Sequence, residues 1–272
     1  MPKKIITEEL KQNIINYYLS YPMALSQVEK HFDLSHPTIS KILKDVPKYP
    51  KAKINNPELK ERFFEIIDNE EKAYFLGLLI ADGNVFKDTT GRQASISITL
   101  DLKDEYMLLK FKEVLNANTN IGYDGRGCGQ IAIRSNLMAT DLEKYGVVPR
   151  KSLITYLPKI KDKYMNHLIR GILDGDGSIR AEQTQFNNRF AHYIGFCGNE
   201  QLMEDISNYC VKLKLNTIPK VHIYQDKNLS DIKIQSKNDM YIFGEWLYKD
   251  ATIFLKRKKD KYELFKSHYN LK

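Results

Sequence analysis

The chain contains two mostly apolar runs, at residues 74–83 and 168–177. Both runs include small residues, glycine or alanine, at regular spacing. In the first run Gly77 and Ala81 are four positions apart, and the second run repeats this spacing of small residues. Residues four apart lie on one face of a helix, and a face of small residues lets a second backbone approach closely. The pattern therefore predicts two buried helices that pack against each other through their small faces.

Each run ends on an acidic residue followed by glycine, Asp82-Gly83 in the first and Asp176-Gly177 in the second, with the two acids 94 positions apart. We expect both glycines to take the left-handed conformation that ends many helices. Packed helices would bring the two carboxylates together at the negative ends of their dipoles, which is unfavourable. A raised pKa on one carboxyl, or a divalent cation held by both, would resolve this repulsion. A Mg²⁺ ion with oxygen ligands suits phosphodiester hydrolysis.

Three other interpretations of the runs compete with a paired acidic site. A membrane span needs about 20 apolar residues, which neither run supplies. A calcium loop starting at Asp174 would need glycine at its sixth position and glutamate at its twelfth, where the chain has Ile179 and Gln185. A core helix with an incidental aspartate would explain one run, but the second copy favours a functional pair.

After each run come alternating segments that predict strands, followed by a helix, more strands and another helix. The halves share the form Ile-x-Ile-polar-Ser at residues 131–135 and 232–236. The chain is therefore expected to be an α+β protein with one αββαββα unit used twice, in two pseudo-symmetric repeats.

The polar faces of these strands carry hydroxyl, amide and basic side chains, and a two-stranded ribbon with such residues can enter the major groove of DNA. A solvated sheet face is the alternative, since antiparallel sheets often have one. The predicted DNA contacts on the strands are Ser95, Ser97, Thr99, Arg134, Lys220, His222, Tyr224, Lys233 and Gln235.

The first 45 residues predict three short helices, at about 7–19, 24–32 and 36–44. They resemble a helix-turn-helix of the kind found in bacterial regulators and recombinases, although Glu29 and Asp33 depart from its usual alanine and glycine. A helical packing module is the alternative. If the resemblance holds, the residues nearest the groove are Ser35, His36, Pro37, Thr38, Ser40 and Lys41.

Composition supports a nucleic-acid partner. The 42 basic and 34 acidic residues give a formal charge of +8, which favours a polyanion. Three cysteines without metal-ligand spacing fit a reducing, cytoplasmic setting, where the protein would act on host, phage or organellar DNA. No long apolar segment is present, so we expect no association with a membrane.

The two runs resemble the motifs of the LAGLIDADG homing endonucleases, intron-encoded nucleases that carry two such motifs in their single-chain form. The nine-residue motif matches residues 75–83 and 169–177. Its eighth position, the metal-binding acid, is Asp82 in the first copy and Asp176 in the second. Its sixth position is acidic in the second copy only, where Asp174 corresponds to Ile80. The resemblance extends over about residues 58–268 and implies that the two repeats form a DNA-binding saddle.

The resemblance also implies the rest of the active site. Residues 145–151 and 253–258 look like the segments that close each repeat and deliver a catalytic lysine, Lys151 and Lys258. Arg150, Lys256 and Arg257 are close enough in sequence to be alternatives. The family further implies that the backbone carbonyls of Ala81 and Gly175 help Asp82 and Asp176 to bind Mg²⁺.

The resulting prediction is a monomeric double-strand DNA endonuclease with an added DNA-binding head. The predicted domains are a helix-turn-helix at 1–45, a basic proline-rich linker at 46–57, and LAGLIDADG repeats at 58–160 and 161–272. Two alternatives use the same scaffold. One is a transcriptional regulator that binds DNA without cleaving it, and the other is a maturase that binds intron RNA.

Overall fold

A computed structural model describes residues 6–20, 25–46, 56–87, 93–124, 127–184, 189–224 and 227–271. These residues form two compact units, one containing the first three helices and one that begins at Lys60. Within the described ranges, no helix combines the length and the apolar character that a membrane span requires.

The first unit consists of three helices, α1 (Glu8–Ser20), α2 (Leu25–Phe32) and α3 (His36–Ile42). Thr7 caps α1 by accepting a hydrogen bond from Leu10 N at 3.2 Å. The turn before α3 contains Asp33 in the left-handed conformation, with a φ of 51°, at the place where glycine is usual. The buried core of this unit consists of Ile14, Tyr18, Val28, Ile39 and Leu43.

The second unit contains the same succession of elements twice. The first half is α4 (Glu70–Ala81), β1 (Gly83–Phe86), β2 (Ser95–Asp101), α5 (Glu105–Val114), β3 (Gly122–Tyr123), β4 (Cys128–Arg134) and α6 (Asn136–Glu143). The second half is α7 (Met165–Asp176), β5 (Ser178–Gln183), β6 (Phe190–Gly198), α8 (Glu200–Lys212), β7 (His222–Tyr224), β8 (Leu229–Ile234) and α9 (Lys237–Tyr248). A further helix, α10 (Lys256–His268), follows.

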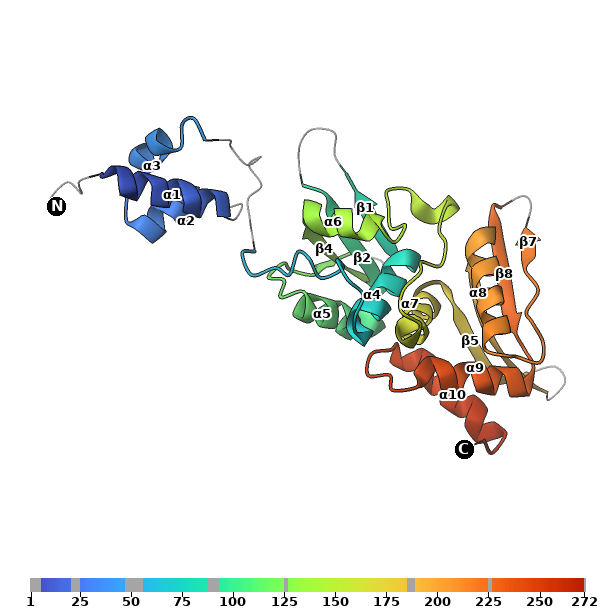
Figure 1. The fold of residues 1–272 in the computed structure, drawn as a ribbon. Helices are drawn as coiled ribbons and strands as arrows, with labels where there is room; N and C mark the ends of the chain where they lie inside the picture. The colour runs from blue at the N-terminus through green and yellow to red at the C-terminus, as the bar shows by residue number, and fades with distance from the viewer. Residues whose placement is uncertain are drawn as a thin grey trace. The chain divides into compact units, whose positions relative to one another are not determined.

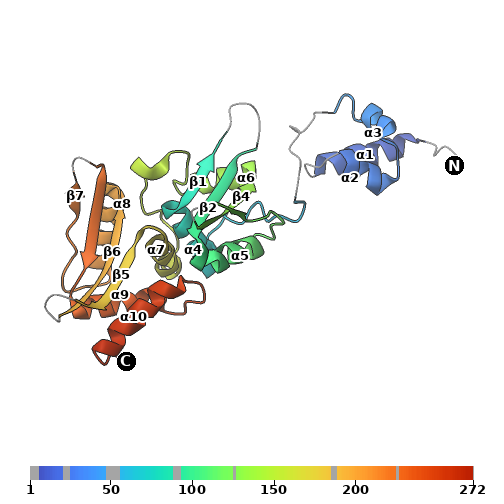
Figure 2. The same cartoon turned by 180° about the vertical axis from the view of Figure 1, so that it is seen from behind.

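Each half contributes one antiparallel four-stranded sheet, in the orders β1-β2-β4-β3 and β5-β6-β8-β7. The two central helices, α4 and α7, lie side by side between the sheets (Figures 1 and 2). Two pseudo-symmetric αββαββα repeats are therefore present, which confirms the predicted fold class.

The helices α4 and α7 meet through glycine. A Cβ atom on Gly77 would overlap the carbonyl oxygen of Leu168, and one on Gly171 would overlap that of Tyr74. Close backbone approach therefore requires glycine at both positions, as the spacing of small residues predicts. The apolar side chains on the other sides of both helices are buried in the flanking cores.

The predicted conformation of Gly83 and Gly177 is wrong. Neither has a positive φ: Gly83 is the first residue of β1, and Gly177 is extended with φ −97° and ψ 177°. Both positions need a small residue for a different reason. A Cβ atom there would overlap the preceding helix at Leu79 or Leu173, because the chain turns sharply from helix into strand.

The alternating segments form strands with the expected faces. In β2, Ile96 and Ile98 are buried, while Ser97 between them is partly exposed. Two residues predicted on strands lie just outside them, since Lys220 precedes β7 and Gln235 follows β8. Most of the predicted linker, residues 47–55, lies outside the described residues, so the domain boundaries stay predictions.

Candidate active site

Two carboxylates lie where α4 and α7 end. Asp82 directly follows α4 and Asp176 is the last residue of α7. Asp82 Oδ2 is only 3.2 Å from the position that a Cβ atom would take on Gly175, so the carboxylate of one helix lies against the backbone of the other. Among the described residues, neither carboxylate accepts a hydrogen bond within 3.5 Å or has an ion-pair partner within 4.0 Å.

The electrostatics of this pair are unfavourable, as its placement predicts. Burial, followed by the charge of Asp176, raises the pKa of Asp82 to about 6. Burial also raises the pKa of Asp176. The charges of Lys151 and Lys258 act in the opposite direction on both carboxyls. The site therefore holds two partly desolvated acids that a cation would stabilise.

The two predicted lysines both reach this site and are both buried. Lys151 is 6% exposed and Lys258 is 4% exposed, whereas Arg150, Lys256 and Arg257 are exposed. Burial lowers the pKa of Lys151, and it lowers the pKa of Lys258 to about 8. The structure therefore separates these lysines from their basic neighbours, which sequence alone does not.

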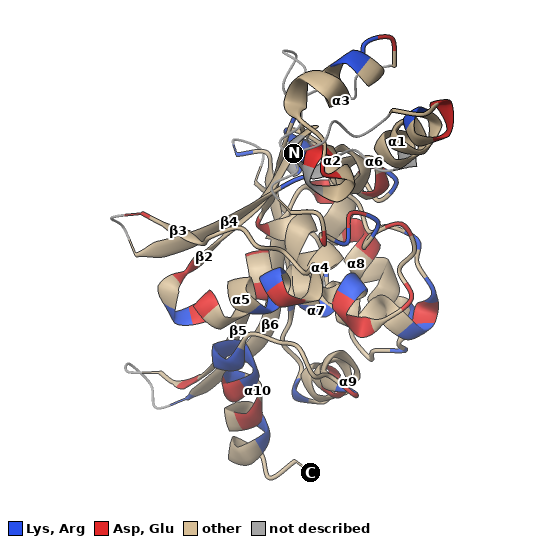
Figure 3. Cartoon of the chain, turned by 90° about the vertical axis from the view of Figure 1, so that its left-hand side faces the viewer, with Lys and Arg blue, Asp and Glu red and all other residues tan. Residues whose placement is uncertain are grey.

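The backbone positions of the lysines differ. Lys151 is the first residue of a short 3₁₀ helix, residues 151–153, and follows Arg150 in the left-handed conformation with a φ of 58°. Lys258 lies in the first turn of α10, which begins with four consecutive basic residues (Figure 3). Arg257 in that turn pairs with Asp104 at 2.8 Å.

Both lysines donate hydrogen bonds to the ends of the central helices. Lys151 Nζ donates to Ala81 O at 3.0 Å. Lys258 Nζ donates to Leu173 O at 2.5 Å, to Asp174 O and Gly177 O at 2.7 Å, and weakly to Gly175 O at 3.5 Å. The two carbonyls predicted as metal ligands, those of Ala81 and Gly175, thus face ammonium groups. Their role in metal binding stays a prediction.

The oxygen donors at the site suit a divalent metal ion. Two carboxylates, both with raised pKa and without protein partners among the described residues, offer the hard ligands that Mg²⁺ prefers, with water and phosphate able to complete the coordination. The described residues contain no group of three or more His, Cys, Asp or Glu side chains that could hold a metal ion by themselves. The chemistry of Asp82 and Asp176 therefore fits a divalent metal ion.

The first sheet presents the predicted polar face. Ser97 pairs with Ala132 in the register of β2 and β4, and Thr99 pairs with Gln130, whose amide donates to the Thr99 hydroxyl at 2.9 Å. Ser95 lies opposite Arg134, which is exposed. Cross-strand partners share a face, so the four predicted residues of this sheet, Ser95, Ser97, Thr99 and Arg134, lie together on one side.

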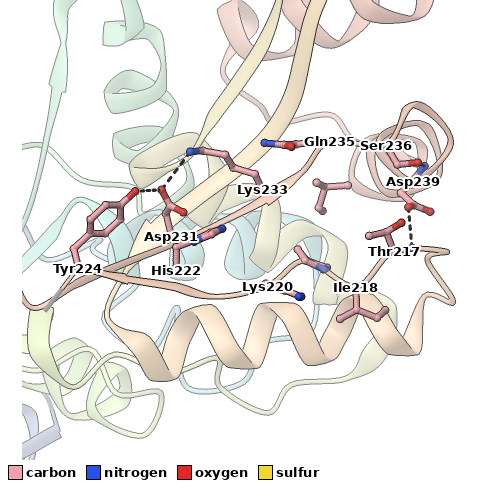
Figure 4. A pocket seen from close by; sticks show the side chains of 12 residues that line it. Thr217, Ile218, Lys220, His222, Tyr224, Asp231, Lys233, Gln235, Ser236 and Asp239 are labelled. Atoms are coloured by element: carbon pink, nitrogen blue, oxygen red, sulfur yellow. Dashed lines mark hydrogen bonds and ion pairs between the residues drawn. The ribbon is translucent and has the colours of Figure 1, made fainter.

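The second sheet carries a groove of about 390 Å³ at β7 and β8 that the predicted residues line (Figure 4). His222 and Tyr224 lie on β7, Lys233 on β8, and Lys220 and Gln235 beside these strands.

Sequence reasoning missed Asp231, which accepts a hydrogen bond from Tyr224 at 2.9 Å and faces Lys233 at 3.4 Å (Figure 4). Arg180 on β5 is a second candidate for DNA contact that the sequence analysis does not name. Its alternation with the buried Ile179 and Ala181 would have predicted its place on the polar face of the strand.

In the first unit, the predicted contact residues lie on α3 or directly before it. Ser35, His36, Ser40 and Lys41 are exposed, and Thr38 is partly exposed. His36 Nδ1 lies 2.5 Å from Glu29 Oε1, which gives the unusual glutamate of α2 a partner. The hydroxyl groups of Ser35 and Thr38 form a hydrogen bond, with their oxygens 2.9 Å apart. The groups are positioned together, but their contact with DNA stays a prediction.

Comparisons with known proteins give a clear result for the fold. No protein-family model matches the chain, and no curated protein matches its sequence. Solved structures do match.

The LAGLIDADG meganuclease I-CpaMI bound to uncleaved DNA aligns with a TM-score of 0.55 and 16% identity, over 75% of this chain and 92% of its own. I-SmaMI bound to uncleavable DNA aligns at 0.53 with 13% identity, over 76% and 92% of the two chains. I-AabMI bound to uncleaved DNA aligns at 0.53 with 12% identity, over 75% and 91%. The chain therefore has the LAGLIDADG meganuclease fold, as its two motifs predict.

Proposed function

We propose that this chain, which has the fold of the LAGLIDADG meganucleases, is a site-specific DNA endonuclease that cleaves both strands of double-stranded DNA as a monomer. The paired carboxylates carry the proposal. Asp82 and Asp176 meet between two sheets with polar faces, each beside a buried lysine. Three structural neighbours are meganucleases bound to DNA, which supports the same class of substrate.

In the proposed mechanism, Asp82 and Asp176 hold divalent metal, which we take to be Mg²⁺. A bound ion of this kind would supply a water of lowered pKa and would stabilise charge on the leaving oxygen. The carboxylates must be deprotonated to bind it, so a proton on Asp82, whose pKa burial raises to about 6, would compete with the metal ion at low pH.

The lysines would act on the scissile phosphates directly. Lys151 and Lys258 place one ammonium group at the end of each central helix, one for each DNA strand. Positive charge in a partly desolvated site stabilises developing negative charge far better than charge in water. Because its pKa is about 8, Lys258 stays mostly protonated at neutral pH.

The sheets would bind the DNA on both sides of the scissile phosphates. Hydroxyl groups of β2 and the exposed Arg134 of β4 can contact phosphates or base edges in one half-site. In the other half-site, Lys233, His222 and Tyr224 are available. Asp231 in the same groove could accept a hydrogen bond from a cytosine amino group.

The test is cleavage of a randomised double-stranded DNA library with Mg²⁺, comparing wild type with Asp82→Asn and Asp176→Asn. Linear products from wild type alone would support the paired-carboxylate mechanism and would identify the target. Selective DNA binding without cleavage by any of the three proteins would contradict it.

The second candidate is a DNA-binding regulator without nuclease activity, and the separate unit α1–α3 favours it. Exposed polar and basic residues around α3 resemble the recognition helix of a helix-turn-helix. The same cleavage experiment distinguishes the two, because a regulator needs no unpartnered acidic pair. Maturase activity on intron RNA stays a prediction that a splicing assay would test.

A further inference from the structure

Five polar side chains, all buried except the partly exposed Glu70, form a cluster along α4 and α7, beside the carboxylate pair but separate from it. This cluster consists of Glu70, Tyr74, His167, Arg170 and Asp174. Arg170 is 0% exposed and Asp174 is 1% exposed. Burial of charged groups costs free energy unless each group finds close partners. The partners of this cluster are therefore informative.

The guanidinium of Arg170 contacts the last turn of α9, the segment that follows α9, and two other members of the cluster. Its Nε donates to Ile253 O at 2.8 Å and its Nη1 donates to Leu247 O at 2.6 Å. Its Nη2 donates to Glu70 at 2.6 Å and lies 2.9 Å from His167 Nδ1. Burial lowers the pKa of His167 to about 4, so the imidazole is neutral and can accept this bond.

The two carboxylates of the cluster also hold the segment that follows α9. Glu70 accepts hydrogen bonds from Thr252 N at 2.8 Å, Thr252 Oγ1 at 2.7 Å and Ile253 N at 3.1 Å. Asp174 Oδ2 accepts from Leu255 N at 2.7 Å and from the Tyr74 hydroxyl at 2.8 Å. Four backbone groups between residues 252 and 255 are thus held by Glu70, Arg170 and Asp174.

The held segment leads directly into the turn that carries Lys258. Lys258 N donates to Leu255 O at 3.0 Å, so the residue that Asp174 holds also forms the first hydrogen bond of that turn. From there Lys258 Nζ reaches three carbonyls at the end of α7 at 2.5–2.7 Å. Fixing Leu255 therefore fixes the position of the Lys258 ammonium group.

The first half lacks this arrangement. At the offset of 94 residues that relates the two motifs, Arg170 corresponds to Leu76 and Asp174 to Ile80, both apolar. The segment before Lys151 is attached instead to the end of α6, where Val147 N donates to Leu142 O at 3.1 Å. Within the described part of the chain, Lys151 Nζ donates to one carbonyl, Ala81 O.

We infer that Asp174, together with Glu70 and Arg170, is a positioning residue for Lys258, and that it serves one of the two half-sites only. The inference rests on the proposed function in assigning Lys258 to one scissile phosphate. Asp174 does not reach a substrate, because it is buried and bonded to Leu255 N. Its loss should slow cleavage of one DNA strand and leave the other strand unaffected.

The test uses the full-length protein and a supercoiled plasmid with one target site, with each strand labelled separately. Asp174→Ile copies the residue of the first repeat. We expect it to slow cleavage of one strand at least 10-fold, so that plasmid nicked on the other strand accumulates. Asp174→Asn keeps an acceptor for Leu255 N and should retain most of the activity on both strands.

Two matched controls are available. Tyr74→Phe removes a hydrogen bond to the same carboxylate but leaves its bond to Leu255 N, so it should not create a strand bias. Ile80→Val alters the equivalent position of the first repeat without changing its polarity, and it should leave both strands unchanged. Equal slowing of both strands by Asp174→Ile, or no slowing of either, would overturn the inference.

Hydrogen exchange gives a readout that does not depend on cleavage. In Asp174→Ile, the amides of residues 252–258 should exchange faster than in wild type, while those of residues 147–151 should not change. If wild type cleaves no DNA, the proposed function fails, yet this measurement still decides whether Asp174 holds the segment. Unchanged exchange at 252–258 would contradict the positioning role.

Discussion

The segment that ends at Lys151 and the segment that ends at Lys258 reach the same pair of helices by different means. The first is attached to the end of its own α6 by backbone hydrogen bonds, with Gly146 in the left-handed conformation. The second is attached to charged side chains of α4 and α7, namely Glu70, Arg170 and Asp174. A repeat can therefore keep its fold and its catalytic group while the way it secures that group changes.

The largest expected effect of this difference is on stability. Arg170→Leu copies Leu76 and removes the guanidinium that pairs with Glu70 and holds two carbonyls. Breaking a buried ion pair from one side costs about 3–5 kcal/mol. Urea unfolding should show this loss, whereas Leu76→Met, a volume-conserving change at the equivalent position, should cost less than about 1.5 kcal/mol. Similar losses for the two variants would mean that the halves are equally dependent on these positions.

Lys151 and Lys258 should each contribute to the cleavage of a different DNA strand. We expect Lys258→Met to slow cleavage of one strand about 100-fold and Lys151→Met to slow the other by a similar factor, since each removes one preorganised stabilising charge. Strand-specific gel analysis of single-turnover reactions measures both rates. If either variant slowed both strands equally, the assignment of one lysine to each half-site would be wrong.

The glycine contact between α4 and α7 should behave symmetrically, in contrast to the closing segments. Gly77→Ala and Gly171→Ala each force a methyl group against a backbone carbonyl, and overpacking of this kind costs about 1–3 kcal/mol. Thermal unfolding should show nearly equal decreases in Tm for the two variants. Gly122→Ala is the control, because its Cβ would have no neighbour closer than 4.0 Å. Clearly unequal decreases would show that the helices do not contact each other symmetrically.

The sequence could predict what repeats or alternates. The helices, their contact through small residues and both aspartates follow from spacing, and the sheet faces follow from alternation. The prediction of a left-handed conformation for Gly83 and Gly177 is wrong because glycine is needed in two situations, a left-handed turn and a close approach between backbone and neighbouring atoms. The sequence does not distinguish the two. The roles of Glu70 and Arg170 could not be predicted. Charged residues in a sequence are usually predicted to be exposed. The hydrogen-bond partners of Glu70 also lie up to 183 positions away in the chain, so no local pattern indicates them.

The smallest expected effect concerns the aspartates themselves. The pKa of Asp82 is about 6 in the folded protein against an ordinary value of 3.8, so the folded state binds a proton more tightly than the unfolded state between these values. The carboxyl therefore costs stability above pH 6, and this cost disappears as the pH falls to about 4.

In metal-free protein at pH 7.5, Asp82→Asn should raise the free energy of unfolding by about 1 kcal/mol. This value allows for the solvent screening of a partly exposed group. The expected increase in Tm is roughly 2–4 °C. At pH 4 its Tm should equal that of wild type. Asp176→Asn should act in the same direction, because burial raises that pKa as well. The measurement is calorimetry with chelator at both pH values. A stabilisation that persisted at pH 4 would have to come from something other than the charge of the carboxylate, and would remove the electrostatic reason for placing a cation between the two acids.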